Sequence, residues 1–192
     1  MKTMKILLVS HNPITTYNNM GKTFQSLFSA FKPEELCQLY LYPAIPDTNT
    51  CGCYYRFTDR DALHSLFCRG IVGNEIVPNL KSHDRFIDKK EERTYKSAFA
   101  HTNLARLGRD VIWHISNWNN ATLNDWINRQ SPDLIFVAPG PQKLLYDIAI
   151  TIAKTRNLPV VAYVCDDYYF LEGNAGALSD LQKRCLCRKI EE

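Results

Sequence analysis

Three short apolar segments of strand length constrain the fold of this chain more than any other feature. They are residues 5–10 (KILLVS), 133–138 (DLIFVA) and 159–164 (PVVAYV). Each is a nearly continuous apolar run, which is typical of a strand that is covered on both faces. Because such strands occur in sheets that carry helices on either side, the segments predict an α/β fold.

Helical patterns connect these segments. Residues 20–32 repeat apolar side chains at three- and four-residue spacing and end before Pro33, and residues 36–42 then give a further strand. In residues 143–156 the apolar side chains make a single stripe, namely Leu144, Leu145, Ile148, Ala149 and Ile152. Strands joined by helices through short links predict parallel pairing with right-handed crossovers.

Two further helices have local signals. Thr58, with Asp61 three positions later, is a helix-start pattern and predicts a helix over Asp59–Phe67. Residues 121–129 place Leu123, Trp126 and Ile127 on one side and predict a second helix.

The middle of the chain is less regular. Residues 68–90 are rich in glycine, asparagine, proline and charge, and predict loops with one strand near residues 71–77. From Glu91 a helical period runs through Ala100, Leu104, Leu107, Val111, Ile115 and Trp118. The whole pattern indicates one three-layer, Rossmann-like α/β domain with a mostly parallel sheet of about five strands.

Charge and hydropathy argue against several classes of protein. The net charge of the 192-residue chain is only +3, and the basic segment from Lys81 to Lys96 is interrupted by acidic residues, so it reads as a solvated face and not as a nucleic-acid-binding patch. No apolar run approaches the about 20 residues that span a bilayer. The first apolar stretch is too short for a signal peptide and lacks a cleavage site, so we expect a cytoplasmic protein.

The cysteines predict reduced thiols. The chain has seven, an odd number, scattered through a sequence of ordinary core-forming composition. The pairs Cys51-Gly-Cys53 and Cys185-Leu-Cys187 could supply four zinc ligands. Zinc ribbons prefer two residues between paired ligands, however, and no histidine flanks either pair. We therefore expect free thiols and no metal.

Candidate ligand-binding residues lie where the predicted strands end. In an open α/β sheet, ligands bind outside the carboxyl ends of the strands, so three loops should meet at one rim. Those loops supply the candidate binding residues, which are His11, Asn12, Thr15, Thr16, Gly140, Pro141, Tyr168 and Tyr169. His11 could be a general base or a hydrogen-bond donor there, although a single loop histidine is more often solvated or structural. His114, within a helical run, is better explained as structural.

Asp166 and Asp167 are the most distinctive polar feature. Two adjacent carboxylates repel each other and need a cation, a helix N-terminus or a ligand hydroxyl. They could bind sugar hydroxyls beside the flat aromatic rings that follow. Equally, one aspartate could cap a turn while the tyrosines pack.

The stretch Gly21-Lys-Thr23 looks like the end of a phosphate-binding loop. That motif needs a glycine five residues before Gly21, where the chain has Thr16. We therefore interpret Gly21-Lys-Thr23 as the first turn of a helix.

Several of these segments together resemble a known family. They are the first strand with its Asn/Pro loop, RDVIWHISNW (109–118), PDLIFVAPGP (132–141), LYDIAITIAK (145–154) and PVVAYVCDDYYF (159–170). The resemblance is to the N-terminal domain of GT-B glycosyltransferases, of the group-one type that builds bacterial surface polysaccharides. It covers residues 100–170 and the first strand. It departs from the family in two places, since residues 12–19 contain no glycine and Asp166 stands where many relatives have histidine.

The resemblance implies a function. The chain would be the acceptor-side half of an enzyme that moves a sugar from a nucleotide-sugar donor to a saccharide or lipid-linked acceptor, with Asp166 and Asp167 as the catalytic candidates and no cofactor. The donor would be bound mainly by a second, C-terminal domain that we expect to be missing from this chain. The complete enzyme would be compatible with peripheral association with a membrane. Alone, the chain should bind weakly and transfer nothing.

Other functional classes remain open. A stand-alone flavodoxin-like domain could bind a ligand or act as a regulatory module without enzymatic activity. Receiver domains need an acidic pair after the first strand, where this chain has His11 and Asn12. A sugar-nucleotide epimerase of the same two-domain build is a third class.

Overall fold

The computed structural model describes residues 3–67, 72–80, 103–140, 143–165 and 177–191. Within these residues, six strands form one sheet in the order β4-β3-β2-β1-β5-β6. The strands are β1 (Ile6–Ser10), β2 (Leu36–Tyr40), β3 (Cys53–Arg56), β4 (Asn74–Ile76), β5 (Leu134–Ala138) and β6 (Val160–Ala162). Neighbours are parallel throughout except β3 and β4, which pair antiparallel.

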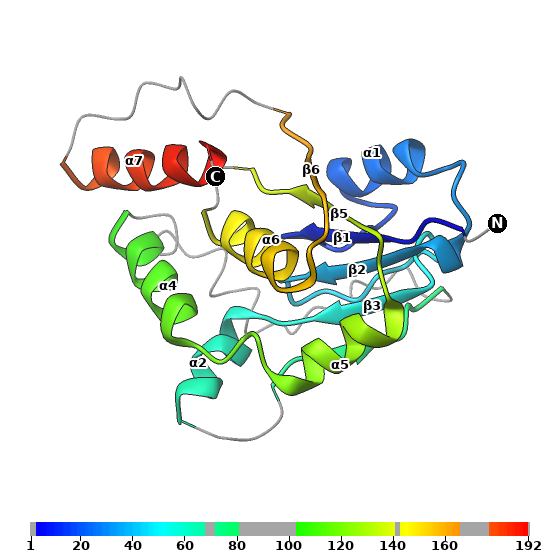
Figure 1. Cartoon of the computed structure of the whole chain (residues 1–192), viewed down its shortest axis with the longest axis horizontal. Helices are drawn as coiled ribbons and strands as arrows, with labels where there is room; N and C mark the ends of the chain where they lie inside the picture. The colour runs from blue at the N-terminus through cyan, green and yellow to red at the C-terminus, as the bar shows by residue number, and fades with distance from the viewer. Residues whose placement is uncertain (1–2, 68–71, 81–102, 141–142, 166–176, 192) are drawn as a thin grey trace.

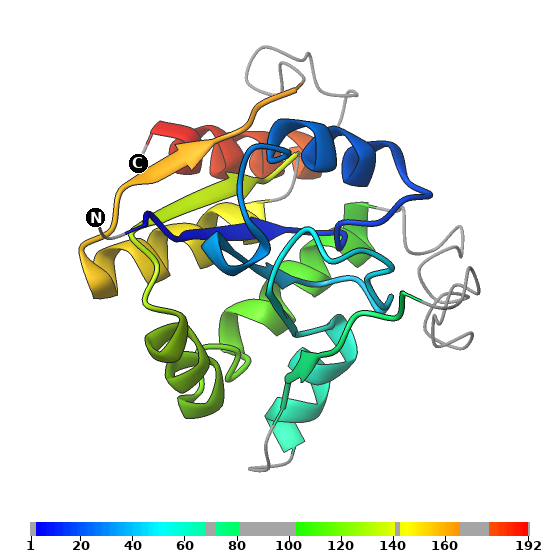
Figure 2. The ribbon, with the colours of Figure 1, turned by 90° about the vertical axis from the view of Figure 1, so that its right-hand side faces the viewer.

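Helices cover both faces of this sheet. They are α1 (Asn19–Leu27), the 3₁₀ helix η1 (Pro33–Glu35), α2 (Asp59–Phe67), α4 (Asn103–Ile115), α5 (Ala121–Gln130), α6 (Lys143–Arg156) and α7 (Ala177–Glu191). Figures 1 and 2 show α1 on one side of the strands and α5 on the other. The predicted three-layer, Rossmann-like α/β fold with a mostly parallel sheet is therefore confirmed.

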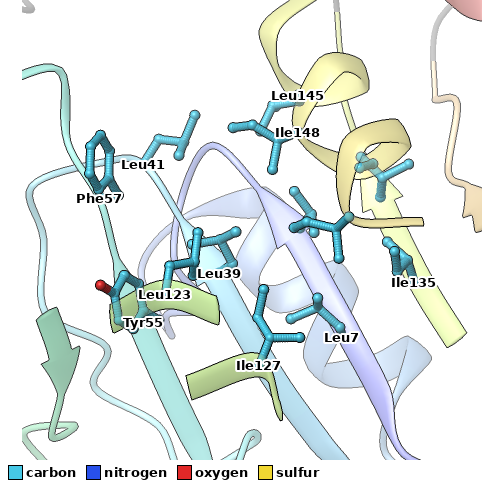
Figure 3. Packing of buried hydrophobic residues seen from close by; sticks show 14 of the residues in the cluster. Leu7, Leu39, Leu41, Tyr55, Phe57, Leu123, Ile127, Ile135, Leu145 and Ile148 are labelled. Atoms are coloured by element: carbon cyan, nitrogen blue, oxygen red, sulfur yellow. The ribbon is translucent and has the colours of Figure 1, made fainter. Parts of the chain in front are cut away.

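The larger part of the core lies on the face covered by α5 and α6. Odd-numbered residues of β1 and β2, such as Leu7 and Leu39, point to this face and meet Leu123, Ile127 and the apolar stripe of α6 (Figure 3). Since strand side chains alternate between faces, the even-numbered residues supply the opposite core.

The opposite core is mainly aromatic. Phe24 of α1 and Phe28, the residue that caps α1, pack against Phe136 of β5, with ring centroids 6.0 and 5.0 Å apart, and Tyr163 stacks on Phe136 at 6.1 Å. Edge-to-face and stacked rings at these distances are favourable arrangements. The helical spacing of the phenylalanines in α1 is what brings them onto the sheet.

The strongest local patterns are confirmed. The segments predicted as strands at residues 5–10, 36–42 and 133–138 contain β1, β2 and β5, and the predicted helix over 143–156 is α6, with its whole apolar stripe buried. Helix α2 spans the predicted residues, and Thr58 and Asp61 make the reciprocal hydrogen bonds of a capping box. Helix α5 buries its three predicted residues.

Two helix predictions need correction. Helix α1 ends at Leu27, where Phe28 caps it, and Pro33 begins η1 instead of ending α1. The helix predicted from Glu91 is described from Asn103 to Ile115, but Leu104, Val111 and Ile115 are 67%, 52% and 60% exposed. Its buried side is set by Trp113, whose indole is anchored to α2.

For two strands the structure also differs from what the sequence predicts. Strand β3 has only four residues, Cys-Tyr-Tyr-Arg, and the sequence patterns miss it. Strand β6 lies where a buried strand is predicted, yet Val160 and Val161 are 41% and 46% exposed. The reason is that β6 is the last strand of the described sheet and pairs only with β5.

Helix α7 has no counterpart among the predicted elements. It packs on α6 through Leu186, which is buried, and through an ion pair between Lys189 and Asp147 with an N–O distance of 3.1 Å.

Candidate functional site

The strand order reverses between β1 and β5. The parallel strands lie in the order β3-β2-β1-β5-β6. After β1 the chain adds β2 and β3 on one side of β1, and it then returns to add β5 and β6 on the other side. Helices α1 and α6 consequently cover opposite faces, and the loops after β1 and β5 separate at the carboxyl edge. Such a switch point is where open α/β sheets bind ligands. We call this edge the rim.

Gln38 of β2 fixes the loop that follows β1. Its amide nitrogen donates to Ser10 Oγ at 2.8 Å and to the Asn12 carbonyl at 3.2 Å, and its amide oxygen accepts from the Ile14 N–H at 3.1 Å. The side chain is fully buried, and these three bonds pair both its donor and its acceptor sides. The loop is therefore held in one conformation from within the sheet.

Thr15 and Thr16 take part in the loop's own structure. Thr15 is buried, and its hydroxyl oxygen accepts from the Asn18 amide nitrogen at 2.5 Å. Thr16 is exposed, and both its N–H and its hydroxyl donate to the Asp47 carboxylate, the former at 2.9 Å. Asp47, in the segment after β2, is a loop anchor that the sequence patterns miss.

Gly21 lies in the first turn of α1, as predicted. Its N–H donates to the Asn18 side chain, which caps the helix. An added Cβ at Gly21 would lie 2.5 Å from the Thr15 backbone nitrogen. The glycine therefore allows α1 to approach the loop backbone closely.

His11 is the first residue of the rim after β1. Its carbonyl accepts from the N–H groups of Leu41 and Tyr42 at 3.1 and 2.8 Å, which continues the strand pairing by one residue. The imidazole meets the Tyr42 ring edge-on, with centroids 5.7 Å apart. Burial and, to a smaller extent, the Arg109 cation lower the pKa of His11 to about 4, although the Asp59 carboxylate opposes this. The imidazole is therefore neutral at pH 7.

A carboxylate bound by two side chains lies within electrostatic range of His11. Arg109 Nε donates to both oxygens of Asp59, at 2.9 and 3.0 Å, and Trp113 Nε1 donates to Oδ1 at 2.6 Å. Asp59 is the first residue of α2, three residues after the end of β3, and the helix dipole favours a negative charge at this position. The cluster of His11, Asp59, Arg109 and Trp113 is named the rim cluster below.

The sequence patterns do not identify Asp59 and Arg109 as a pair. They lie fifty positions apart and come from different helices, and Asp59 follows a strand that was itself missed. A carboxylate just after a strand is the one signal that could have pointed to Asp59.

A second set of charged side chains lies on α4, α6 and α7. Asp147 pairs with Lys143 one turn earlier in α6 and with Lys189 of α7. Burial raises the pKa of Asp110 in α4, while the Lys143 and Arg109 cations lower it. These groups join three helices, and Asp110 is the one of them that interacts electrostatically with Arg109 of the rim cluster.

The remaining predicted site residues are placed only in part. Gly140 ends the described segment after β5 in a left-handed turn, with φ of 54°, and Asn12 contributes its carbonyl to the Gln38 network. Pro141, Asp166, Asp167, Tyr168 and Tyr169 lie outside the described residues. The predicted residues that the structure describes lie in the loops after β1 and β5, and they are His11, Asn12, Thr15, Thr16 and Gly140.

The described part of the chain has neither a candidate metal site nor a candidate membrane span. There, no group of three or more histidine, cysteine or acidic side chains is arranged to hold a metal ion. Nor is any helix among those residues both long enough and apolar enough to cross a bilayer.

Comparison with known proteins gives no relative. No family model, no curated protein and no solved structure matches this chain.

Proposed function

We propose that this chain is the acceptor-side half of a GT-B-type glycosyltransferase that acts in the cytoplasm on a saccharide or lipid-linked acceptor. The observation that carries the proposal is the position of the rim cluster, which lies at the carboxyl edge of a sheet of Rossmann strand order. The resemblance of residues 100–170 to this family supports the same assignment. The nucleotide-sugar donor is proposed to bind mainly to a second domain.

The strand order bears on the alternative of a flavodoxin-like module. Flavodoxin-like sheets place the parallel strands in the order 2-1-3-4-5, whereas the parallel strands here follow the order 3-2-1-4-5 when counted along the chain. The glycosyltransferase proposal therefore agrees better with the described topology.

The chemistry of His11 suits recognition of a hydroxyl. A neutral imidazole offers one hydrogen-bond donor and one acceptor, and with a pKa of about 4 it stays in that form throughout the physiological range. In the proposal, His11 orients an acceptor hydroxyl and the Asp59–Arg109 pair keeps the surrounding backbone fixed. Asp166 and Asp167 remain the proposed groups that contact the reacting sugar.

The experiment is a titration of the isotopically labelled chain, followed by NMR, with a panel of neutral oligosaccharides and nucleotide-sugars. Binding of an isolated saccharide should be weak, with Kd on the order of 1 mM. The amide signals of His11, Asn12 and Gly140 should shift on addition of an oligosaccharide. The variant His11→Ala should lose this response.

The control is His114→Ala, because His114 is exposed on α4 and lies outside the rim cluster. It should leave the titration unchanged. A chain that binds no saccharide at tens of millimolar, or binds one with shifts confined to other surfaces, would overturn the proposal. Tight binding of nucleotide-sugars at the rim without saccharide binding would instead make this the donor side.

A further inference from the structure

Two cysteines are neighbours at the amino ends of strands β2 and β3, which is the end of the sheet opposite the rim. Cys37, the second residue of β2, is the register partner of Cys53, the first residue of β3. Both side chains lie on the same face, since Cys37 belongs to the core covered by α5 and α6 and Cys53 packs against that core. Neighbouring strands lie about 4.8 Å apart, which falls within the Cα separation of disulfide-bonded cysteines.

The two thiols have different environments. Cys37 is fully buried, whereas Cys53 is partly exposed. The Cys37 Sγ–H donates to the Ile6 carbonyl at 3.5 Å. The neighbouring Cys37 side chain lowers the pKa of Cys53, burial opposes this, and the Lys5 cation lowers the pKa further. The neighbouring Cys53 side chain and burial raise the pKa of Cys37. Cys53, the more exposed thiol and the one with the lowered pKa, is therefore the better placed of the two to attack an oxidant, and Cys37 is its buried partner.

We propose that Cys53 and Cys37 are a redox-active pair that forms a reversible disulfide when the protein meets a peroxide. The Cys53 thiolate attacks one peroxide oxygen, so that an S–O bond forms, the O–O bond breaks and hydroxide leaves. The Cys37 sulfur then attacks the Cys53 sulfenic acid. An S–S bond forms, the S–O bond breaks, and the departing hydroxide takes the Cys37 proton as water. Two thiols are oxidised and one peroxide is reduced to two waters.

The geometry favours a bridge that is easily reduced. Strand partners must bring their Cβ atoms from the strand spacing of about 4.8 Å to about 3.8 Å to be joined, and strained disulfides have the more oxidising potentials. The bridge would close a ring through residues 38–52. That ring contains Asp47, which holds Thr16 in the loop after β1.

Cys51 is close in sequence but is not the partner. It is buried in the core on the other face, beside Tyr54, and its backbone N–H donates to the Tyr54 hydroxyl at 3.1 Å. The intervening Gly52 is held against the Pro33 carbonyl, its N–H donating to that oxygen at 2.6 Å. A Cys51–Cys53 bridge would have to break this arrangement.

Peptide mapping by mass spectrometry under non-reducing conditions tests the proposal. The folded protein is treated briefly with hydrogen peroxide, and remaining thiols are alkylated. A Cys37–Cys53 linked peptide should appear and should disappear after treatment with dithiothreitol. The variant Cys51→Ala should give the same linkage, which is the matched control.

The variants Cys37→Ala and Cys53→Ala separate the two roles. With Cys37→Ala, Cys53 should accumulate as the sulfenic acid and be trapped by dimedone at least tenfold more than in the unchanged protein. Cys37→Ala removes a buried side chain and could disturb the core, so a second variant is needed. Cys53→Ala changes the more exposed position, and in this variant Cys37 should stay unoxidised. The proposal is overturned if the exposed Cys165 reacts faster than Cys53, or if the linkage found involves Cys51.

Discussion

The guanidinium of Arg109 in α4 holds the carboxylate of Asp59 at the start of α2, with Nε 2.9 and 3.0 Å from the two oxygens. Trp113, one turn further along α4, donates to the same carboxylate. Because both α4 residues donate to one carboxylate, Asp59 joins α4 to α2. Because α4 turns Trp113 inward, the apolar residues on its other sides are left exposed to solvent.

Replacing Asp59 by asparagine should destabilise the protein. Asparagine keeps the shape but removes the charge that pairs with Arg109 and strengthens the Trp113 bond. Both charged partners are partly exposed, so we expect a loss of about 1–2 kcal/mol in the free energy of unfolding. For a chain of this length, that lowers Tm by about 2–8 °C in a thermal melt. Glu34→Gln, at an exposed position in η1, is the control and should change Tm by less than about 1 °C. An equal effect of the two substitutions would refute the anchoring role of Asp59.

Gln38→Leu should loosen the loop after β1. The substitution keeps a side chain of similar size but leaves the Ile14 N–H without its buried acceptor. Such a group costs about 1–3 kcal/mol. Amide hydrogen exchange should therefore speed up at Ile14 by tenfold or more. Gln25→Ala serves for comparison, because its amide donates only to the Thr15 carbonyl and it should leave Ile14 protected. If Ile14 stays protected in Gln38→Leu, the loop is held by other contacts.

His11 should make the folded state sensitive to acid. In the unfolded chain its imidazole takes up a proton below the ordinary pKa of 6.5, while the folded protein keeps it neutral down to about 4. The unfolded state therefore binds more protons between these values, and stability falls as the pH is lowered from 6.5 to 4. The shift of the pKa from 6.5 to about 4 corresponds to a loss of about 3 kcal/mol over this pH range.

Urea unfolding at several pH values measures this effect. The slope of stability against pH between 4 and 6.5 should be smaller in His11→Gln than in the unchanged protein. His114→Ala should keep the original slope. Parallel curves for the unchanged protein and His11→Gln would mean that the imidazole is protonated in the folded state.

Two glycine-to-alanine substitutions should have opposite signs. In Gly21→Ala the new Cβ meets the Thr15 backbone, which cannot move away as a flexible side chain could, so we expect a loss of more than about 2 kcal/mol. In Gly108→Ala the new Cβ has nothing within 4 Å, and alanine is the better helix former, so stability should rise by about 0.5–1 kcal/mol. Thermal melts of both variants test this. Destabilisation by Gly108→Ala, or tolerance of Gly21→Ala, would contradict the packing described.

The sequence predicts the fold where the information is local. The apolar stripe of α6 and the Thr58–Asp61 capping pattern each lie within a few residues, and both correctly give their helices. Strand β3 is too short for a periodic signal. The exposure of β6 depends on how many strands pair with it, which no pattern within residues 159–164 contains.

The candidate site is harder to predict from local sequence patterns than the fold is. The rule that ligands bind at the carboxyl ends of strands selects the loop that contains His11, but it does not select the Asp59–Arg109 contact. The Asp59–Arg109 contact joins residues fifty positions apart, and its formation depends on how two helices pack. Gln38 did carry a signal, because a polar residue interrupts an otherwise apolar strand, Leu-Cys-Gln-Leu-Tyr. Such a residue is stable in a core only when its amide is fully hydrogen-bonded.

The central claim is that the rim binds the saccharide acceptor of a sugar-transfer reaction. The NMR titration of the labelled chain with neutral oligosaccharides tests it most directly. We expect saturable shifts at His11, Asn12 and Gly140 that are lost in His11→Ala and kept in His114→Ala. Shifts that persist in His11→Ala, or a rim that does not respond to any saccharide, would contradict the claim.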